Sequence, residues 1–276
     1  MRPRAHVIPA GDPPDAAYPY ASLDQGANGA YGGVAFSWLE ETGTLTETDF
    51  AFKENQLKPY GMAAYVTASN KALRNIDALS AEINTLLPEA LANTEDQVFL
   101  TGDGVGKPKG ALVSEARLVV SRDTASSIKY VDIVNMMGKM LPSSKGRASQ
   151  GRGPVWVAHV NAEAQLLQMV DGASNLIYIQ GNAVAGRPST LMGYPVIYTG
   201  KVSDVGTEAD LNFCDFNYYA IKDGSGLLVA SSEHVHFLSS KTVIKFENNV
   251  DGQLRHNEPL TLEDGTTQVS SIVVLG

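Results

Sequence analysis

The sequence predicts an α+β protein, and three observations predict it. Apolar residues recur at spacings of three and four over residues 77–99, as on one face of a long helix. Runs rich in β-branched and aromatic residues, bounded by Gly, Pro and Asp, predict short strands over most of the chain from residue 176 onward. Residues 125–230 mix such strands with two shorter helical patterns. We therefore expect a compact segment beside one long helix and long strands.

The composition favours a protein whose surface is partly covered by other molecules. Charged residues make up 18% of the 276 residues, below the ~25% of average globular proteins, and glycine is plentiful at 26 residues. Other copies of the same chain are the simplest cover, although an ordinary β-rich monomer fits the composition equally well. The net charge of −9 argues against a dedicated DNA-binding protein, because tight binding rests on Lys and Arg.

The single cysteine and the lack of long apolar segments indicate the compartment. Cys214 cannot form an intrachain disulfide, and its apolar surroundings predict a small core residue rather than a reactive thiol. No apolar segment of signal-peptide length follows Met1, and no apolar run approaches the ~20 residues of a membrane span. We expect a protein that is made in a cytoplasm, remains soluble there and has no membrane partner.

The first part of the chain is expected to form two extended features. Residues 1–33 are rich in Pro and Gly and predict an arm that needs a neighbouring surface to order it. Residues 34–40 and 50–58 predict the two strands of a long hairpin with a polar tip, and residues 62–68 predict a further strand. The tip has too little apolar surface to bury itself, so the hairpin should lie on a partner or be mobile.

Helical patterns occur in three places. The longest helix covers residues 77–99 and contains Pro88, which should kink it. The second begins after a cap at Ser126 or Ser127 and ends at Pro142. The third is the shortest and covers residues 162–170.

The rest of the chain is expected to form strands and loops. A strand of alternating character is predicted at 155–160 after a flexible basic loop over 143–153. A long strand is predicted at 233–248, followed by a turn at Asp251-Gly252. The remaining expected strands are short: 111–120, 176–180, 195–199, 209–214, 217–222, 226–230 and 267–275.

The glycine-rich segment from Gly102 to Gly110 invites comparison with nucleotide-binding loops. A P-loop has four residues between its glycines and then Lys and Ser or Thr. Here three residues separate Gly102 from Gly106, and Pro108 stands in place of the hydroxyl residue. The segment also follows a helix, whereas a dinucleotide fingerprint follows a strand. We expect a helix C-terminal cap followed by tight turns.

Other motifs give little support to enzyme chemistry. His234 and His236 share one face of an expected strand and could bind a metal, but the adjacent sequence offers no third ligand. Surface or interface histidines are the alternative interpretation. No nucleophile elbow of the form Gly-x-Ser-x-Gly occurs. The basic residues Lys145, Arg147 and Arg152 could touch nucleic acid, although a solvated loop is the simpler interpretation.

Four segments match, in order, the segments of one known protein family. Residues 95–112, EDQVFLTGDGVGKPKGAL, resemble the end of that family's long helix and its following loop. Residues 64–69 resemble the strand before this helix, and residues 189–196 and 212–221 resemble two later segments, LLGYPV and GDFSRYYI. Together they cover about residues 34–260. The chain thus resembles the major capsid proteins of tailed bacteriophages of the Hong Kong 97 type.

The resemblance implies the α+β capsid fold of that family and assigns regions to it. Residues 1–33 would be the N-terminal arm, and residues 34–66 the extension loop. Residues 67–124 and 231–276 would form the peripheral domain, with the long helix as its spine. Residues 125–230 would form the axial domain.

The resemblance also implies a structural protein and no enzyme. Copies of the chain would assemble as hexamers and pentamers into an icosahedral virion shell, built in the host cytoplasm. The shell would enclose double-stranded DNA without sequence-specific binding. Scaffold, portal and decoration proteins are further candidate partners, and no cofactor or metal is implied.

Three alternatives stay open at this point. A gene transfer agent capsid or a cargo-enclosing nanocompartment would have the same fold. A metal-dependent enzyme would use His234 and His236. A phage-derived adhesive or tail-associated β-rich protein would form fibres or rings instead of a shell.

The extension loop supplies the candidate residues for the assembly interface. They are Trp38, Glu41, Thr46, Glu47, Phe50, Lys53 and Lys58. Some family members crosslink a lysine of this loop to a neighbouring asparagine, but Thr46 stands at that position, so we expect no crosslinking. The chain starts near the arm. A scaffolding segment is therefore expected to be a separate protein, to have been cleaved, or to lie outside this chain.

Overall fold

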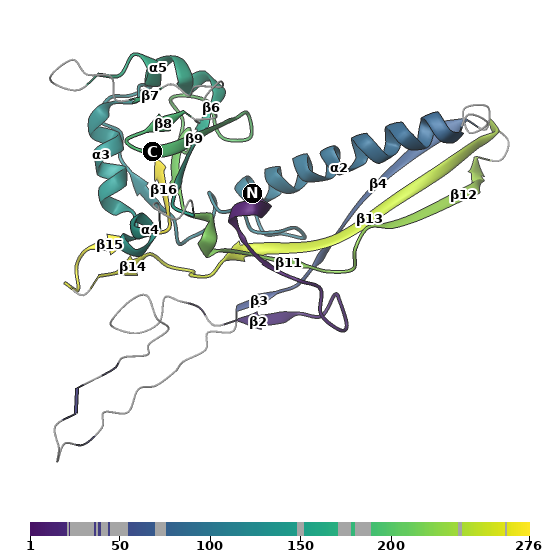
Figure 1. Ribbon diagram of the computed structural model, residues 1–276, viewed down its shortest axis with the longest axis horizontal. Coiled ribbons are helices and arrows are strands. Elements are labelled where there is room, and N and C mark those ends of the chain that lie inside the picture. Colours follow the sequence, from purple (N-terminus) through teal and green to yellow (C-terminus); the bar gives the residue numbers. More distant parts are fainter. Residues whose placement is uncertain are drawn as a thin grey trace.

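The computed structural model describes most of the chain and places it in two lobes. The described residues are 1–20, 55–69, 76–147, 152–170, 178–179, 189–236, 239–262 and 264–276, with the single residues 22, 36, 38, 39 and 44. One lobe is elongated and the other compact (Figure 1). The mixture of helices and sheets confirms the predicted α+β class. Of the helices in the described ranges, none combines the length and hydropathy needed to span a lipid bilayer.

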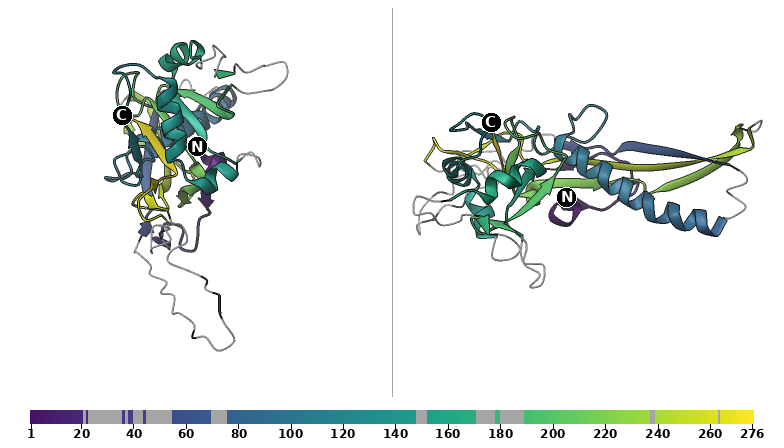
Figure 2. Two further views of the ribbon diagram at one scale, coloured as in Figure 1. Left: turned by 90° about the vertical axis from the view of Figure 1, so that its left-hand side faces the viewer. Right: turned by 90° about the horizontal axis from the view of Figure 1, so that it is seen from above.

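The elongated lobe is one long helix that lies along a long sheet. Its elements are α2 (Ile76–Thr101), β4 (Tyr60–Ser69), β12 (Leu228–His236), β13 (Lys241–Leu254), β11 (Tyr219–Asp223) and β1 (His6–Ile8). Strand β13 is central, since β4 pairs with one of its edges while β12 and β11 pair in succession with the other. All three pairings are antiparallel, and β1 adds to β11 in parallel. Helix α2 runs beside the strands in a second view as well (Figure 2). The helix agrees with the predicted one, and Pro88 lies inside it.

The predicted long strand over residues 233–248 is wrong, because this stretch is a hairpin. Strands β12 and β13 run in opposite directions, so that His236 lies opposite Lys241. Ser240 has a positive φ of 50°, which ends the extended run before β13 begins. Serine is common in turns, so Ser239 and Ser240 were a signal of the reversal, but the apolar residues on both sides favoured one continuous strand.

The predicted turn at Asp251-Gly252 is also wrong, because both residues lie inside β13. Gly252 has a packing role there. A Cβ atom at this position would lie 2.8 Å from the ring of Tyr219, so only glycine lets that ring lie against the strand. Tyr219 lies on β11, and its hydroxyl donates a hydrogen bond of 2.8 Å to the backbone carbonyl of Lys109. This bond ties β11 to the loop after α2.

The compact lobe is built on a mixed sheet. Among the described residues, seven strands lie in the order β5-β16-β10-β6-β9-β8-β7. Their bounds are β5 (Leu118–Val120), β16 (Ile272–Leu275), β10 (Leu211–Cys214), β6 (Val155–His159), β9 (Tyr194–Thr199), β8 (Thr190–Leu191) and β7 (Tyr178–Ile179). The lobe also contains α3 (Tyr130–Lys139), α4 (Pro142–Gly146) and α5 (Glu163–Leu167).

The short elements differ in length from the predictions. The third helix, expected over 162–170, is a 3-10 turn followed by α5 alone. The expected final strand over 267–275 is divided into two strands, β15 and β16. The remaining short elements are η1 (Arg2–Arg4), β2 (Tyr18–Tyr20), β3 (Asn55–Leu57), η3 (Val160–Ala162), η4 (Phe216–Tyr218), β14 (Leu260–Thr261) and β15 (Gln268–Val269).

Both faces of the central strands β6 and β10 are buried. On one face Trp156 stacks on Phe213 with ring centroids 4.2 Å apart, in a core that includes Ile133 and Met136 of α3. The other face belongs to a second core. Strand β6 therefore has four consecutive buried residues, and the alternating exposure expected for residues 155–160 is wrong.

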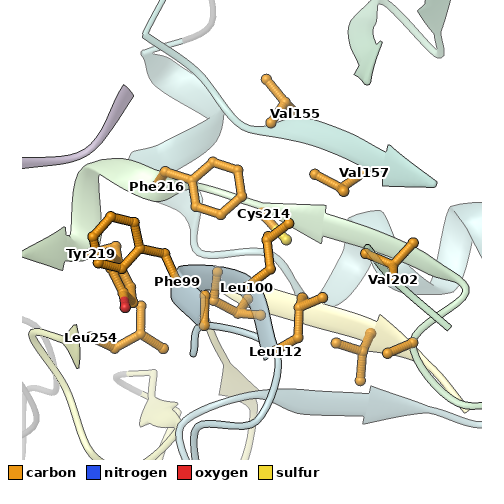
Figure 3. Close-up of a cluster of buried hydrophobic side chains, with 14 of the residues drawn as sticks. Phe99, Leu100, Leu112, Val155, Val157, Val202, Cys214, Phe216, Tyr219 and Leu254 are labelled. Carbon is orange, nitrogen blue, oxygen red and sulfur yellow. The ribbon is translucent and has the colours of Figure 1, made fainter. Parts of the chain in front are cut away.

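The second core joins the two lobes (Figure 3). Phe99 at the end of α2 and Leu254 of β13 come from the elongated lobe, and Val157 and Cys214 come from the compact sheet. Cys214 is fully buried, and burial raises the pKa of its thiol, in agreement with the predicted core role. Apolar burial at the junction attaches one lobe to the other.

Helix α3 begins later than expected. The predicted cap at Ser126 or Ser127 is wrong, because Lys129 is the residue before the first helical turn. The carboxylate of Asp132 accepts a hydrogen bond of 2.8 Å from the backbone N–H of Lys129, which is one half of a capping box. The helix also ends at Lys139, before the predicted stop at Pro142. Pro142 instead opens α4, where its missing N–H has no cost.

The segment from Gly102 to Gly110 forms close-packed turns, as predicted. Gly104 and Gly106 have positive φ values of 80° and 65°, which glycine adopts without strain. A Cβ atom on Gly102 would lie 2.3 Å from the carbonyl oxygen of Pro108. The glycines of this family-like phrase are thus required by backbone contacts and backbone conformation.

The residues after this loop cap helix α2. The backbone N–H groups of Ala111 and Leu112 donate to the carbonyls of Phe99 and Leu100 at 2.8 and 3.0 Å. These carbonyls would otherwise be unpaired at the helix end. Because the amides are used in this way, the strand predicted over 111–120 is limited to β5.

Candidate assembly surfaces

The first residues of the chain are attached to its own body. The Met1 amino group forms an ion pair of 2.7 Å with Asp96. The Arg2 guanidinium donates to both carboxylate oxygens of Glu95, at 2.5 and 2.8 Å, and to Asp223 at 2.7 Å. The hydrogen bonds to Glu95 raise the pKa of Arg2 above its usual value. The expectation that the arm needs a neighbouring surface is therefore wrong for its first residues.

A sequence signal for this anchor existed in helix α2. Glu95 lies four residues after Leu91 and four before Phe99, on the apolar face of the helix. Its side chain is only 4% exposed. A carboxylate on a buried face needs a cationic partner, but the partner lies 93 residues away in the sequence. The local sequence pattern could therefore indicate that Glu95 needs a cationic partner, but it could not identify Arg2 as that partner.

Tyr20 and Asn55, which flank the largely undescribed residues 21–54, lie side by side. Strand β2 pairs antiparallel with β3, with Tyr18 opposite Leu57 and Tyr20 opposite Asn55. Leu57 is fully buried, and the backbone N–H of Lys58 donates to the Asp251 carboxylate at 2.6 Å. Of the strand predicted over 50–58, only β3 and Lys58 lie among the described residues, and β3 pairs with β2. The expected partner, 34–40, lies largely outside the described residues.

Two of the seven predicted interface residues can be placed. Trp38 is fully exposed, and Lys58 is exposed next to the β2–β3 ladder. The other five lie outside the described residues: Glu41, Thr46, Glu47, Phe50 and Lys53. Their role as interface residues stays a prediction.

One face of the elongated sheet is covered by α2. Met62 and Ala64 of β4 and Phe246 of β13 lie on this face, and Leu87 and Leu91 of the helix lie against them. A groove of about 140 Å³ remains between the helix and the sheet. The helix covers only part of this side of the sheet, since Val66 and Val229 on the same face are 44% and 60% exposed.

The opposite face of the same sheet is open. Tyr65 of β4 points to this side, since strand neighbours alternate, and it is 73% exposed. Leu228 of β12 is on the same side and 57% exposed. Lys245 and Glu247 of β13 form an ion pair on this face. A long sheet with one open, partly apolar face is typical of a surface that another molecule covers.

The carboxylate of Asp251 connects β13 to the root of the segment after β2. It accepts hydrogen bonds from the backbone N–H groups of Lys58 and Gly252, at 2.6 and 2.7 Å. Its residue is 6% exposed, and burial raises the pKa of this carboxyl to about 6 in spite of these two bonds. The folded protein therefore binds a proton at Asp251 more tightly than the unfolded chain does.

Replacing Asp251 by asparagine is expected to remove a pH-dependent loss of stability. The raised pKa means that the wild type is most stable, with respect to this group, below about pH 4, and loses free energy of unfolding as the pH rises to about 6. The shift corresponds to about 3 kcal/mol. Urea unfolding between pH 4 and pH 8 should show Asp251→Asn gaining relative to wild type over this range. Glu89→Gln, at an exposed site, should follow the wild type, and a constant difference for Asp251→Asn would contradict the assignment.

The alternative metal site finds no support in the described part of the chain. His234 lies exposed on β12. Among the described residues no three His, Cys, Asp or Glu side chains lie close enough to hold a metal ion together. A catalytic zinc site normally has three protein ligands.

Comparisons with known proteins agree with the geometry. The profile of the phage capsid family matches residues 1–263. A search of curated protein sequences finds no significant match. Among solved structures, the fold is similar to the capsid of an empty GTA particle, with a TM-score of 0.70, 19% identity, and coverage of 99% of this chain and 88% of that chain. It is also similar to the capsid of the native GTA particle (TM-score 0.65, 18% identity, coverage 99% and 88%).

A chain from Mycobacterium phage Adephagia has the same fold, with a TM-score of 0.61, 13% identity, and coverage of 99% of this chain and 88% of that chain. These likenesses confirm the predicted capsid fold over the whole chain. The family profile spans nearly all 276 residues, and the architecture of a long helix on an elongated sheet beside a compact lobe accompanies it. This chain therefore belongs to the phage capsid family, as a major capsid protein.

Proposed function

We propose that copies of this chain assemble as hexamers and pentamers into an icosahedral shell that encloses double-stranded DNA. The open face of the elongated sheet carries this proposal, because Tyr65 and Leu228 would remain in water on an isolated chain. The shell is the protein's whole activity, and no bond chemistry is involved. Its place is the virion, and assembly takes place in the host cytoplasm, with scaffold, portal and decoration proteins as further partners.

The regions of the chain take distinct roles in this proposal. Residues 1–33 form the arm, 34–66 the extension loop, 67–124 and 231–276 the peripheral domain, and 125–230 the axial domain, except that β11 belongs to the elongated sheet while β5 and β16 belong to the compact one. The ladder of β2 and β3 supports an extension loop, because it closes the segment between them at its root. The fully exposed Trp38 lies within that segment and is the residue we expect to bury against a neighbouring copy.

Electron microscopy of the purified protein tests the proposal. We expect closed shells of uniform diameter, with five-fold and six-fold clusters of subunits. Small discrete species under every assembly condition would contradict it. The likeness to GTA capsids favours a second candidate, a gene transfer agent capsid. Analysis of the particle contents separates the candidates: nucleic acid supports a phage or transfer agent shell, and an enclosed enzyme supports a nanocompartment.

A substitution on the open face tests the interface itself. Tyr65→Lys should abolish shells, because it places a charge in an apolar contact, while the unassembled chain keeps its stability since this side chain is 73% exposed. Tyr65→Phe, which retains the apolar ring, should still form shells. Sedimentation and microscopy measure both. Normal shells from Tyr65→Lys would show that this face is not part of the interface between copies.

A further inference from the structure

Four arginines from distant parts of the chain surround one cavity. The cavity has a volume of about 450 Å³. Arg4 reaches it from the anchored N-terminus, Arg147 from the end of α4, Arg152 from the stretch before β6, and Arg255 from the end of β13. The N-terminus lies where the two lobes meet (Figure 1). The chain as a whole carries a net charge of −9, so this concentration of positive charge differs from the rest of the molecule.

One of the four arginines is already held in place. Arg147 donates a hydrogen bond of 2.6 Å to the hydroxyl of Tyr218, and its guanidinium lies 4.8 Å from the centre of that ring. It also lies 3.7 Å from the buried carboxylate of Asp215. Asp215 in turn accepts hydrogen bonds from Asn217, which lines the same cavity. These contacts preorganise the polar wall of the cavity before any ligand enters.

The other three guanidinium groups have no partner among the residues that the structure describes. No hydrogen bond or ion pair from the side chains of Arg4, Arg152 or Arg255 reaches a described residue, and all three line the cavity. The single carboxylate of Asp215 opposes the charge of Arg147. Three positive charges therefore remain around one space, and their mutual repulsion is relieved when an anion enters it.

The chemistry of the cavity indicates the class of anion. Guanidinium groups match the oxygens of phosphate with paired hydrogen bonds, and several of them can share one phosphate. A single carboxylate would neutralise one of the three unpaired charges, whereas a phosphate dianion or successive phosphodiesters would neutralise two or more. We propose that this cavity is a binding site for phosphate-class oxyanions. Its two sources are free phosphate and the phosphodiester backbone of DNA, and the second source rests on the proposed DNA-enclosing shell.

Titration calorimetry of the unassembled full-length chain tests this site. The probes are sodium pyrophosphate and a short single-stranded DNA oligonucleotide at low salt. The variant is Arg4→Gln/Arg255→Gln, because neither side chain has a described partner to lose. We expect affinity to fall at least about tenfold for both probes, as two charge-assisted contacts are removed. For DNA, the slope of log K against log salt should become less negative by about 1.4, because two fewer cations contact the single strand.

A matched control removes the same two charges elsewhere. Lys139→Gln/Lys241→Gln lies on exposed positions outside the cavity and should bind both probes like the wild type. Loss of DNA binding alone in the arginine variant supports the phosphodiester source, and loss of both supports the shared chemistry. Wild-type affinity of the arginine variant, or equal loss in the lysine control, overturns the proposal. So does an acidic peptide that binds the wild type as tightly as pyrophosphate and is lost in the arginine variant, since it assigns the cavity to carboxylates.

Shell formation is scored separately by microscopy of the same variants. Shells that form without anion binding would leave the capsid role intact and remove only this site. Anion binding by a chain that never forms shells would remove the capsid role and keep the site.

Discussion

The Gly110→Ala variant will be destabilised by about 3 kcal/mol or more, at the severe end of single substitutions. A Cβ atom there would lie 2.6 Å from the Gly102 nitrogen and the Leu100 carbonyl oxygen. Both are backbone atoms, so no side chain can move to make room. Displacement of the loop would also break the hydrogen bonds of Ala111 and Leu112 to the end of α2. Chemical denaturation monitored by circular dichroism measures the loss.

The same substitution at another glycine provides the control. Gly138 lies inside α3, and beyond its chain neighbours and its own helical backbone no described atom lies within 4 Å of an added Cβ. Gly138→Ala should therefore stabilise the protein by about 0.5–1 kcal/mol, because alanine loses less conformational freedom in a helix. If the two variants changed stability equally, the close backbone contact at Gly110 could not be the cause.

Replacing Arg2 by alanine is expected to cost about 2–4 kcal/mol, because it leaves the buried carboxylate of Glu95 without its cation. The lower part of the usual range for a broken buried pair applies, since the Arg2 side chain is itself 35% exposed. The pairing of β1 with β11 should also loosen, because Arg2 holds the chain end against Asp223 of β11. Denaturation measures the first effect, and hydrogen exchange at His6–Ile8 measures the second.

Two further variants test whether the lost stability comes from the ion pair of Arg2 with Glu95. Arg2→Lys keeps the charge but not the fork of donors that meets both oxygens of Glu95, so it should recover only part of the loss. Arg4→Gln, in the same 3-10 turn, should leave stability near the wild-type value. An equal loss from Arg4→Gln would mean that the turn itself, and not the ion pair, is responsible.

Local patterns predicted the elements whose stability is local. Helix α2 was predicted within two residues at each end, because its apolar face repeats over 26 residues. The turns from Gly102 to Gly110 were predicted, because the glycine spacing matches no nucleotide loop and glycine tolerates positive φ. The family resemblance rests on the same stretch, where backbone contacts restrict the choice of residue.

The predictions were wrong at residues whose local structure depends on contacts with other parts of the chain. Asp251-Gly252 has the composition of a turn, but Tyr219 needs a glycine beside its ring in the middle of β13. Strand β6 alternates in sequence character, but cores on both faces bury all but its last residue. The serine cap failed because Asp132 bonds to the backbone before α3 and so selects a later start.

Residue patterns were enough to predict the long helix, the α+β class and the turns after the helix, because each depends on residues close together in the chain. The capsid family was predicted from four short segments, each of which is local as well. The pairing of Arg2 with Glu95 and Asp223, the pairing of β3 with β2, and the shared cavity of four arginines became evident from the folded chain alone. These contacts join residues up to about 250 positions apart, from Arg4 to Arg255. Nothing in a local pattern specifies such partners, since they are selected by the packing of the two lobes as a whole.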